Sequence, residues 1–355
     1  MYFLQMRKFL AFVAITFIAV SCNQELIINA PWKDVSAIYG ILERTSDTNY
    51  IRIHRGYLGN DGIAGGSQDP DSLYYISPDV KIEIINQNGS VIETVDLIKD
   101  ESIALDPGFF TTEGYHTFRF DKELADDLQY KLIVNKSENG LNQVYAITPM
   151  VDDFTINSPN QNRSLNYAFR NGVEVKWEST GNGRLYELKT RMHYTEMSLL
   201  DNSDIVHKYV EFGVTSKLAN SLNGGQPFIS VIDYDGYYRF LANNIEVNPD
   251  VIRFYEGTDI IIVAAADDFA TYMSVSAPAT TVVQDKPHFT NILGGDNANA
   301  GIFSSTNKAE NLAMKLADDS MDSLVRSMLT CDLQFADKIG QDTVYCQGGI
   351  YPIYK

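Results

Sequence analysis

Apolar and polar residues alternate most clearly in two neighbouring segments of the first half of the chain. Val80, Ile82 and Ile84 alternate with charged residues, and a second apolar segment follows at residues 91–97. A period of two places one face of a strand in a core and the other in water. Between the segments, Asn88-Gly89 accepts the positive φ angles of a tight turn. The pattern therefore predicts a β-hairpin.

Short segments rich in β-branched and aromatic residues recur through the first 150 residues, as is typical of strands. Their regular spacing favours a β-sandwich over alternating strands and helices. The predicted strands are residues 35–42, 50–54, 80–85, 91–97, 115–120, 130–134 and 144–148.

A second unit is predicted to begin near Asp152, with a strand in which Val173, Val175 and Trp177 alternate with polar residues. A glycine-rich turn at 181–183 leads into a long half-buried strand. A Trp-bearing strand followed by a Tyr-rich strand looks like the B and C strands of a fibronectin type III domain. On the long strand, Tyr186, Leu188, Met192 and Tyr194 share one face, while Glu187, Lys189, Arg191 and His193 share the other.

The last third of the chain mixes patterns, with short helices predicted at 237–244 and 269–276, a strand at 260–265 and an amphipathic helix at 321–329. The whole chain is therefore predicted to be mostly β, with two β-sandwich-like domains of immunoglobulin or fibronectin type III character, the second with short helical insertions. The predicted divisions are a signal peptide at 1–21, a lipidated cysteine and tether at 22–34, an N-terminal sandwich at 35–150 and a second domain at 151–355.

The amino terminus has the pattern of an export signal. Arg7 and Lys8 precede an apolar run that ends in Ser21 and Cys22. The run is shorter than the ~20 residues of a membrane-spanning helix, and positive charges in front of it are typical of secretory signals. The pattern predicts cleavage before Cys22 and acylation of its thiol, which would anchor the protein to a membrane. An ordinary thiol at Cys22 is the alternative.

A glycine- and proline-rich segment between Tyr57 and Asp79 predicts a long loop. Such loops within compact domains suggest either function or disorder. We take it as a candidate contact surface and expect its final tyrosines to be exposed, whereas tyrosines on alternating strands are expected in the core, with sugar stacking as the alternative. The candidate contact residues are Tyr57, Asp61, Asp69, Asp71, Tyr74 and Tyr75.

Composition narrows the functional classes. The chain has 355 residues, is 45% hydrophobic and has a formal net charge of −18. That charge repels phosphate backbones, so nucleic acid is not an expected partner. Of the three cysteines, Cys331 and Cys346 remain once Cys22 is acylated, and an oxidising envelope would allow them to form a disulfide.

No residue pattern indicates catalysis. The five histidines are scattered without metal-site spacing, and glycine-rich phosphate loops, dinucleotide motifs and the nucleophile elbow are absent from the sequence. Asp233-Tyr234-Asp235-Gly236 lacks the further ligands of a calcium loop and is interpreted as a turn that begins a helix. The acidic pairs 267–268 and 318–319 favour helix amino termini. We expect no catalytic residues, no metal and no cofactor.

Several short segments of the chain form a recognisable set: Pro31-Trp32-Lys33-Asp34, Ala37-Ile38-Tyr39-Gly40, Tyr237-Tyr238-Arg239-Phe240-Leu241, residues 286–292 and Gly301-Ile302-Phe303-Ser304-Ser305. Together they resemble a family of Bacteroidota lipoproteins, the domain of unknown function 4249 family. The resemblance implies an outer-membrane lipoprotein that accompanies a TonB-dependent transporter, and it carries no catalytic residues. Cys331 and Cys346 are not part of the family pattern.

These observations together predict a non-catalytic envelope lipoprotein that assists such a transporter or captures a small peptide or glycan for it. Two alternatives stay open: a glycan- or peptide-processing enzyme, and a structural or adhesive surface protein. The single acid in Asn23-Gln24-Glu25 leaves both the periplasmic and the cell-surface face of the outer membrane open.

Overall fold

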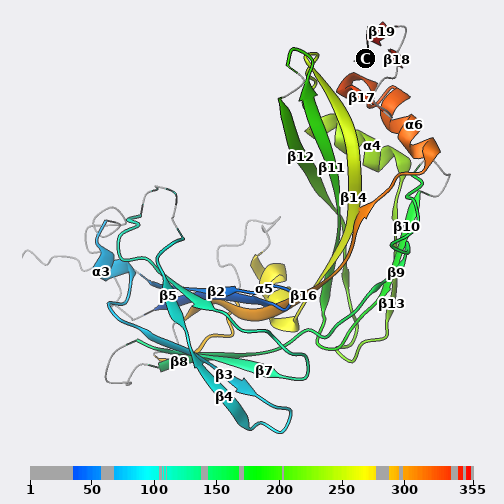
Figure 1. Ribbon diagram of the computed structural model, residues 1–355. Coiled ribbons are helices and arrows are strands. Elements are labelled where there is room, and N and C mark those ends of the chain that lie inside the picture. The colour runs from blue at the N-terminus through cyan, green and yellow to red at the C-terminus, as the bar shows by residue number, and fades with distance from the viewer. Residues whose placement is uncertain are drawn as a thin grey trace, which may run out of the picture.

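A computed structural model describes residues 35–56, 68–103, 106, 108, 110–136, 143–167, 172–201, 204–276, 288–295, 299–336, 343–346 and 349–352. The protein is mostly β and sandwich-like, as predicted from the strand patterns. Figure 1 shows two layered units that meet at an angle.

The first sandwich has two sheets, and each includes one strand from the C-terminal third of the chain. One sheet has β1 (Ser36–Glu43), β2 (Asn49–Arg55), β5 (Ile98–Asp100), β6 (His116–Phe120) and β16 (Ala300–Met314) in the order β16-β1-β2-β6-β5. The other has β3 (Asp79–Ile85), β4 (Val91–Asp96), β7 (Gln129–Asn135), β8 (Gln143–Pro149) and β15 (Leu293–Gly294) in the order β15-β8-β7-β3-β4.

The inward-facing apolar residues of these strands form one core. Ile38 and Ile51 from the first sheet and Val80, Leu132 and Val144 from the second are at most 2% exposed and belong to the same cluster. The predicted alternation of β3 is confirmed, because Val80, Ile82 and Ile84 are buried between partly exposed charged residues.

The second sandwich packs a long sheet, β12-β11-β14-β16, against a small sheet, β13-β10-β9, and against helices (Figure 1). The predicted two-faced strand is confirmed in β11, whose tyrosine, leucine and methionine face is buried. The elements are β9 (Ile156–Ser158), β10 (Val173–Glu178), β11 (Leu185–Ser198), β12 (Ile205–Leu218), β13 (Pro227–Ile232), β14 (Val251–Ala265), α4 (Tyr234–Asn244), α5 (Asp267–Ser276), α6 (Asp318–Arg326), η1 (Cys331–Leu333) and β17 (Phe335–Ala336), followed by the pair β18 (Thr343–Cys346) and β19 (Gly349–Pro352).

The strand β16 belongs to both sandwiches. Its first half pairs in parallel with β1, from Ala37 opposite Ala300 to Glu43 opposite Thr306. Its second half pairs antiparallel with β14, as far as Met314. The predicted second domain, residues 151–355, therefore includes two strands, β15 and the first half of β16, that the structure places in the first sandwich.

Gly301 permits the close parallel approach of β16 to β1. Its φ of +96° lies in the region that favours glycine, and a Cβ at this position would overlap the carbonyl oxygen of Ile38. A side chain here would therefore meet backbone, which cannot move aside as a flexible side chain can.

A polar junction fixes the chain where it passes from the first sandwich to the second. The amide of Asn307, on β16, donates to the backbone oxygens of Val151 and Asp152 and to the carboxylate of Asp153. Arg44, at the end of β1, forms an ion pair with Asp153. The junction is thus held by side chains from segments that are far apart in the sequence.

The helix predictions are largely confirmed. The helices α4 and α5 cover the predicted segments at 237–244 and 269–276, and α6 covers the first part of the segment predicted at 321–329 but ends at Arg326. Each helix begins two or three residues earlier than predicted. Asp233 caps α4 by accepting from the backbone N–H of Gly236, so the turn interpretation of Asp233-Tyr234-Asp235-Gly236 holds. The two predicted acidic pairs occupy the first turns of α5 and α6.

The predicted hairpin exists, but its turn differs from the two-residue type. The strands β3 and β4 pair antiparallel, with Ile85 opposite Val91, so five residues connect them. Only Gly89 has a positive φ within this turn. The side chain of Asn86 accepts from the backbone N–H groups of Asn88 and Ser90 and closes the longer turn.

A buried arginine holds the described C-terminal segment against the second sandwich. Arg253, on β14, is 2% exposed, pairs with Glu196 on β11 at 2.8 Å and donates to the carbonyl of Leu333 at 2.6 Å. Cys331 in η1 is disulfide-bonded, and β18, which contains Cys346, contacts η1. The side chain of Cys346 lies outside the described residues, so its pairing with Cys331 stays a prediction.

Substituting Gly301 tests the shared strand. We expect Gly301→Ala to lower the free energy of unfolding by about 3 kcal/mol or more, because the new methyl adds overlap with Ile38 to backbone strain. Gly89→Ala is the matched control: its φ is +79°, but no atom lies within 4 Å of the new methyl. Equal losses of stability in urea unfolding of the two variants would contradict the proposed role of the close approach.

Two adjacent junction carboxyls should respond oppositely to neutralisation. The hydrogen bond from Arg44, assisted by that from Asn307, lowers the pKa of Asp153, so its ionised form stabilises the fold above the ordinary carboxyl pKa. Burial, together with Asp127 and Asp126, raises the pKa of Asp152, so its charge destabilises the fold at neutral pH.

We therefore expect Asp153→Asn to be less stable and Asp152→Asn more stable than the wild type at pH 7. The Asp153→Asn difference should shrink as the pH falls below about 4. The Asp152→Asn difference should shrink at higher pH, as the pH falls toward about 4, because the raised pKa of Asp152 lets it take up a proton in the folded chain first. Urea unfolding at several pH values measures this, and destabilisation of the same sign in both variants would refute the assignment.

Candidate functional site

The outer face of the β1-β2-β6-β5 sheet carries a row of tyrosine and arginine side chains. In antiparallel strands, directly opposed residues project from the same face. Tyr39 opposes Arg52, Arg52 opposes Thr117, and Tyr50 opposes Arg119. We call this surface the Tyr–Arg face and define it as Tyr39, Tyr50, Arg52, Tyr115, Thr117 and Arg119.

The Tyr–Arg face is turned away from the core of the first sandwich, toward the angle between the two units, where α5 lies against β16 (Figure 1). Tyr39 is 40% exposed and Tyr50 is 42% exposed, whereas Ile51 and Ile53 on the opposite face of β2 are fully buried. Burial raises the pKa of the Tyr39 phenol, and the nearby Tyr272 phenol of α5 raises it further. The expectation that strand tyrosines lie in the core is therefore wrong for Tyr39 and Tyr50.

Arg52 lies at the centre of the Tyr–Arg face without an acidic partner. Its Nε donates to the Tyr115 hydroxyl at 2.8 Å, and its guanidinium lies 4.9 Å from the centre of the Tyr115 ring. Among the described residues, no carboxylate lies within 4.0 Å of Arg52. By contrast, carboxylates pair with Arg44, Arg119, Arg184, Arg191, Arg239, Arg253 and Arg326.

The neighbouring residues of the Tyr–Arg face differ in how far their polar groups are satisfied. Arg119 binds Asp121 at 2.6 Å and approaches Asp100 at 4.0 Å. Hydrogen bonds from Ser102 lower the pKa of Asp100 and hold it ionised. The hydroxyl of Thr117 is buried and has no hydrogen-bond partner in the described part of the chain.

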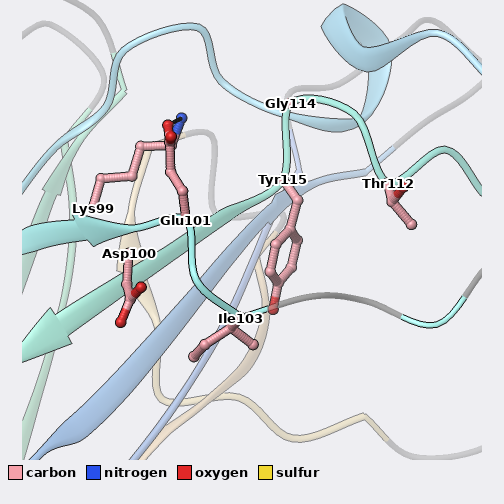
Figure 2. Close-up of a pocket in the computed structure, with 7 residues that line it drawn as sticks. All are labelled: Lys99, Asp100, Glu101, Ile103, Thr112, Gly114 and Tyr115. Atoms are coloured by element: carbon pink, nitrogen blue, oxygen red, sulfur yellow. Dashed lines mark ion pairs between the residues drawn. The ribbon is translucent and has the colours of Figure 1, made fainter.

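A groove of about 330 Å³ continues the face beyond Tyr115. Figure 2 shows the Tyr115 ring projecting beside the strand end that carries Asp100, with Thr112 on the loop that leads to Gly114. Lys99 and Glu101 form an ion pair of 3.2 Å at its rim. The groove is lined by Lys99, Asp100, Glu101, Ile103, Thr112, Gly114 and Tyr115.

The predicted contact loop has a different role from the expected one. Tyr74 and Tyr75 are only 5% and 7% exposed, so the expectation that they are exposed is wrong. The Tyr75 hydroxyl bonds to Ser36 at 2.9 Å, and the Tyr74 hydroxyl donates to the carbonyl of Thr111 at 2.9 Å. The ring of Tyr74 lies 6.2 Å from that of Tyr115 and 5.6 Å from that of His54, so Tyr74 packs at one end of the Tyr–Arg face, whereas Tyr75 belongs to the core of the first sandwich.

The other predicted contact residues are separate from the two tyrosines. Asp69 caps the short helix α3 (Pro70–Leu73) by accepting from Asp71 and Ser72, so part of the predicted loop is helical. The carbonyl of Asp71 accepts from Arg55. Tyr57 and Asp61 lie outside the described residues.

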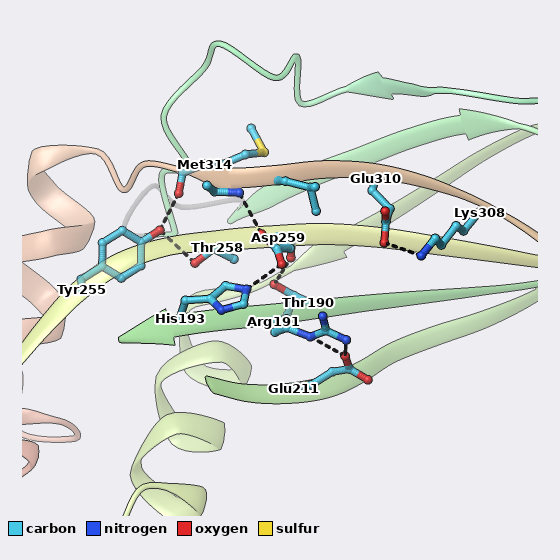
Figure 3. Close-up of polar contacts among 12 residues, drawn as sticks. Thr190, Arg191, His193, Glu211, Tyr255, Thr258, Asp259, Lys308, Glu310 and Met314 are labelled. Carbon is cyan, nitrogen blue, oxygen red and sulfur yellow. Dashed lines mark hydrogen bonds and ion pairs between the residues drawn. The ribbon is translucent and has the colours of Figure 1, made fainter. Parts of the chain in front are cut away.

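A second polar surface lies on the outer face of β11, β12 and β14 (Figure 3). His193 bonds to the buried Asp259 at 2.7 Å, and the other oxygen of Asp259 accepts from the backbone N–H of Ala313. Arg191 forms a two-point ion pair with Glu211. Each charge on this surface thus has a partner within the fold, which is typical of groups that stabilise a sheet.

Three residues of this region have the chemical types of a nucleophilic triad but not its geometry. Thr195 and Glu256 both contact the same ring nitrogen, Nδ1, of His207, at 3.1 and 2.8 Å. A triad needs the nucleophile and the acid on different ring nitrogens, because the histidine passes a proton between them. This arrangement therefore cannot activate Thr195.

No group of three or more His, Cys, Asp or Glu in the described part of the chain is placed to hold a metal ion. No described helix is long and apolar enough to cross a membrane.

Comparisons with known proteins show no family. No family model and no curated protein matches the chain. It is weakly similar to a trypsin-activated alpha-2-macroglobulin from Escherichia coli (11% identity, 67% of this chain, 15% of that chain, TM-score 0.18). It is also weakly similar to the C-terminal globular domain of an oligosaccharyltransferase from Pyrococcus abyssi (12% identity, 68% of this chain, 45% of that chain, TM-score 0.25).

The chain spans less than half of either protein, and neither likeness is strong enough to carry an argument. The resemblance to the Bacteroidota lipoprotein family stays a prediction.

Removing the hydroxyl of a buried tyrosine should lower the free energy of unfolding more than removing that of an exposed one. Tyr75→Phe should lower the free energy of unfolding by about 1–3 kcal/mol, because it leaves the buried Ser36 hydroxyl without its partner. Tyr50→Phe, at an exposed position, should change it by no more than about 0.5 kcal/mol. Thermal or urea unfolding of both variants measures the difference, and the reverse order would show that the supporting and exposed roles are misassigned.

Proposed function

We propose that the protein is a non-catalytic cell-envelope lipoprotein that captures a ligand on the Tyr–Arg face and works beside a TonB-dependent outer-membrane transporter. The observation that carries ligand capture is Arg52, a partly buried guanidinium that lies between exposed tyrosines and has no carboxylate within 4.0 Å among the described residues. Aromatic rings and arginine are the side chains most enriched where proteins bind partners. Seven other arginines form ion pairs with carboxylates of the fold, whereas the guanidinium of Arg52 can still pair with a ligand.

The proposed localisation to the cell envelope is inferred from the sequence. The charged and apolar segments that precede Cys22 support export and acylation. Fourteen residue steps separate Cys22 from Ser36, where β1 begins, and a fully extended chain of that length spans about 50 Å. The first sandwich would therefore stay close to the membrane surface and to a transporter embedded in it.

The described polar clusters support a binding role over catalysis. The groups of the second polar surface are paired with one another, and the Thr195, His207 and Glu256 contacts do not form a proton relay. Two acids, Asp100 and Glu101, line the groove at Tyr115, but the hydrogen bonds from Ser102 hold Asp100 ionised, which does not suit a general acid, and Glu101 is paired with Lys99. Partnership with a transporter comes from the family resemblance.

Fractionation and cross-linking of native envelopes test this proposal. We expect the wild type in the outer-membrane fraction, with mass spectrometry showing an acylated amino-terminal Cys22, and a TonB-dependent transporter cross-linked to it. Cys22→Ala should lose the acyl group and the membrane association. An intact, unmodified amino terminus in the cytosol would refute the envelope localisation. Recovery of the lipoprotein without any transporter would refute its association with a TonB-dependent transporter.

A further inference from the structure

We propose that the Tyr–Arg face binds a carboxylate-bearing glycan, with Arg52 holding the carboxylate of a uronic-acid unit. This inference rests on the proposed ligand-capture function and names the chemical class of the ligand. It is carried by the geometry of Arg52 and by the surfaces on either side of it.

The contacts of Arg52 leave one edge of its guanidinium unused. Nε is engaged by the Tyr115 hydroxyl at 2.8 Å, and no other hydrogen bond engages the guanidinium in the described structure. The two Nη groups therefore remain as a fork that matches the two oxygens of a carboxylate. The Tyr115 ring 4.9 Å away fixes the orientation of the fork before a ligand arrives.

The flanking tyrosines provide flat apolar surface beside that fork. Tyr39 opposes Arg52 on β1, and Tyr50 lies two residues before it on the same face of β2. Both rings are about two-fifths exposed, so each offers a face against which a sugar ring can pack while its hydroxyls stay in water. The Thr117 hydroxyl opposite Arg52 is buried, so it is not itself a contact for the ligand.

The topology favours a glycan over an extended peptide. Peptides commonly bind sheets by pairing with the backbone of an exposed edge strand. Both β2 and β6 are paired on their two sides, and so is β1, so their backbone groups are not available at this face. Recognition around Arg52, away from the edge strand β5, must therefore use side chains. A sugar ring that carries a carboxylate matches tyrosines that flank an arginine.

The groove beyond Tyr115 extends the surface along the same direction. Its volume of about 330 Å³ is at the small end of ligand pockets, which range over about 300–1,000 Å³. Its lining also holds Asp100 and Glu101, and Lys99 is paired with Glu101, so Lys99 and Thr112 offer hydrogen-bond donors for sugar hydroxyls but no net positive charge. A ligand of several sugar units can therefore place one ring at Arg52 and a neighbouring ring in the groove.

Calorimetric titration of the full mature chain with short oligogalacturonates tests the inference. The comparison ligands are the neutral galactose oligosaccharides of equal length and an acidic peptide of similar charge. We expect the wild type to prefer the oligogalacturonates, and Arg52→Gln to weaken that binding by about 10- to 100-fold, as for a lost charge-assisted pair. Binding of the neutral oligosaccharides should be unchanged in this variant.

Arg163→Gln is the matched control for net charge. Arg163 is exposed, lies in a turn far from the Tyr–Arg face in sequence, and also has no carboxylate partner in the described structure. We expect this variant to bind oligogalacturonates like the wild type. Tyr50→Ala should weaken acidic and neutral oligosaccharides alike, because it removes stacking surface and no charge. Thermal unfolding of each variant verifies that it is folded.

Three outcomes would overturn the inference: no oligogalacturonate binding by the folded wild type, equal weakening by Arg52→Gln and Arg163→Gln, or preference for the acidic peptide. None of them bears on whether the wild type is acylated and cross-links to a transporter, so failure of the ligand class is distinguishable from failure of the proposed function.

Discussion

The parallel pairing of β1 with β16 is the constraint on which the rest of the architecture depends. It joins residues 37–43 to residues 300–306, so the first sandwich cannot be completed until most of the chain has been made. The same strand then pairs with β14 and becomes part of the second sandwich. Gly301 makes the approach sterically feasible, and Asn307 fixes the changeover by satisfying backbone oxygens of the connecting segment. The two units are therefore joined through a continuous sheet and not through a flexible linker.

This constraint also shapes the Tyr–Arg face. Because β16 covers one side of β1 and β2 covers the other, Tyr39 projects from an interior strand whose backbone is fully engaged. The helix α5 follows directly from β14 and lies against β16, which places Tyr272 beside Tyr39 at one end of the face. At the other end, the buried Tyr74 supports Tyr115. The face is thus fixed at both ends by elements from opposite parts of the chain, and rigid support of this kind reduces the entropy lost on binding.

Local patterns predicted the local structure well, because the alternation of β3 and β11 and the cap at Asp233 depend on neighbouring residues alone. The pairing of β1 with β16 was not predictable, since parallel register between strands some 260 residues apart leaves no periodic signal. The Tyr–Arg face was missed because strand tyrosines were assigned to the core. The signal was present in β2, where Ile51 and Ile53 alternate with Tyr50 and Arg52, and the isoleucines identify which face is buried. Tyr74 and Tyr75 were misjudged because their burial depends on partners from distant segments, Ser36 and Thr111.

An acidic protein that binds an acidic ligand needs a local field that outweighs its net charge. The formal charge of −18 is spread over the whole chain, and at physiological ionic strength interactions beyond about 8 Å are largely screened. The potential at the Tyr–Arg face is therefore set by the groups in contact with it. There, Asp121 and Asp100 neutralise Arg119, while Arg52 keeps its full charge in a partly buried setting where electrostatic attraction is stronger than in water. The attraction at the Arg52 guanidinium acts over a short range, and the repulsion from the rest of the protein is weak. The site therefore favours a ligand whose carboxylates are separated by neutral surface over a ligand whose charges are closely spaced.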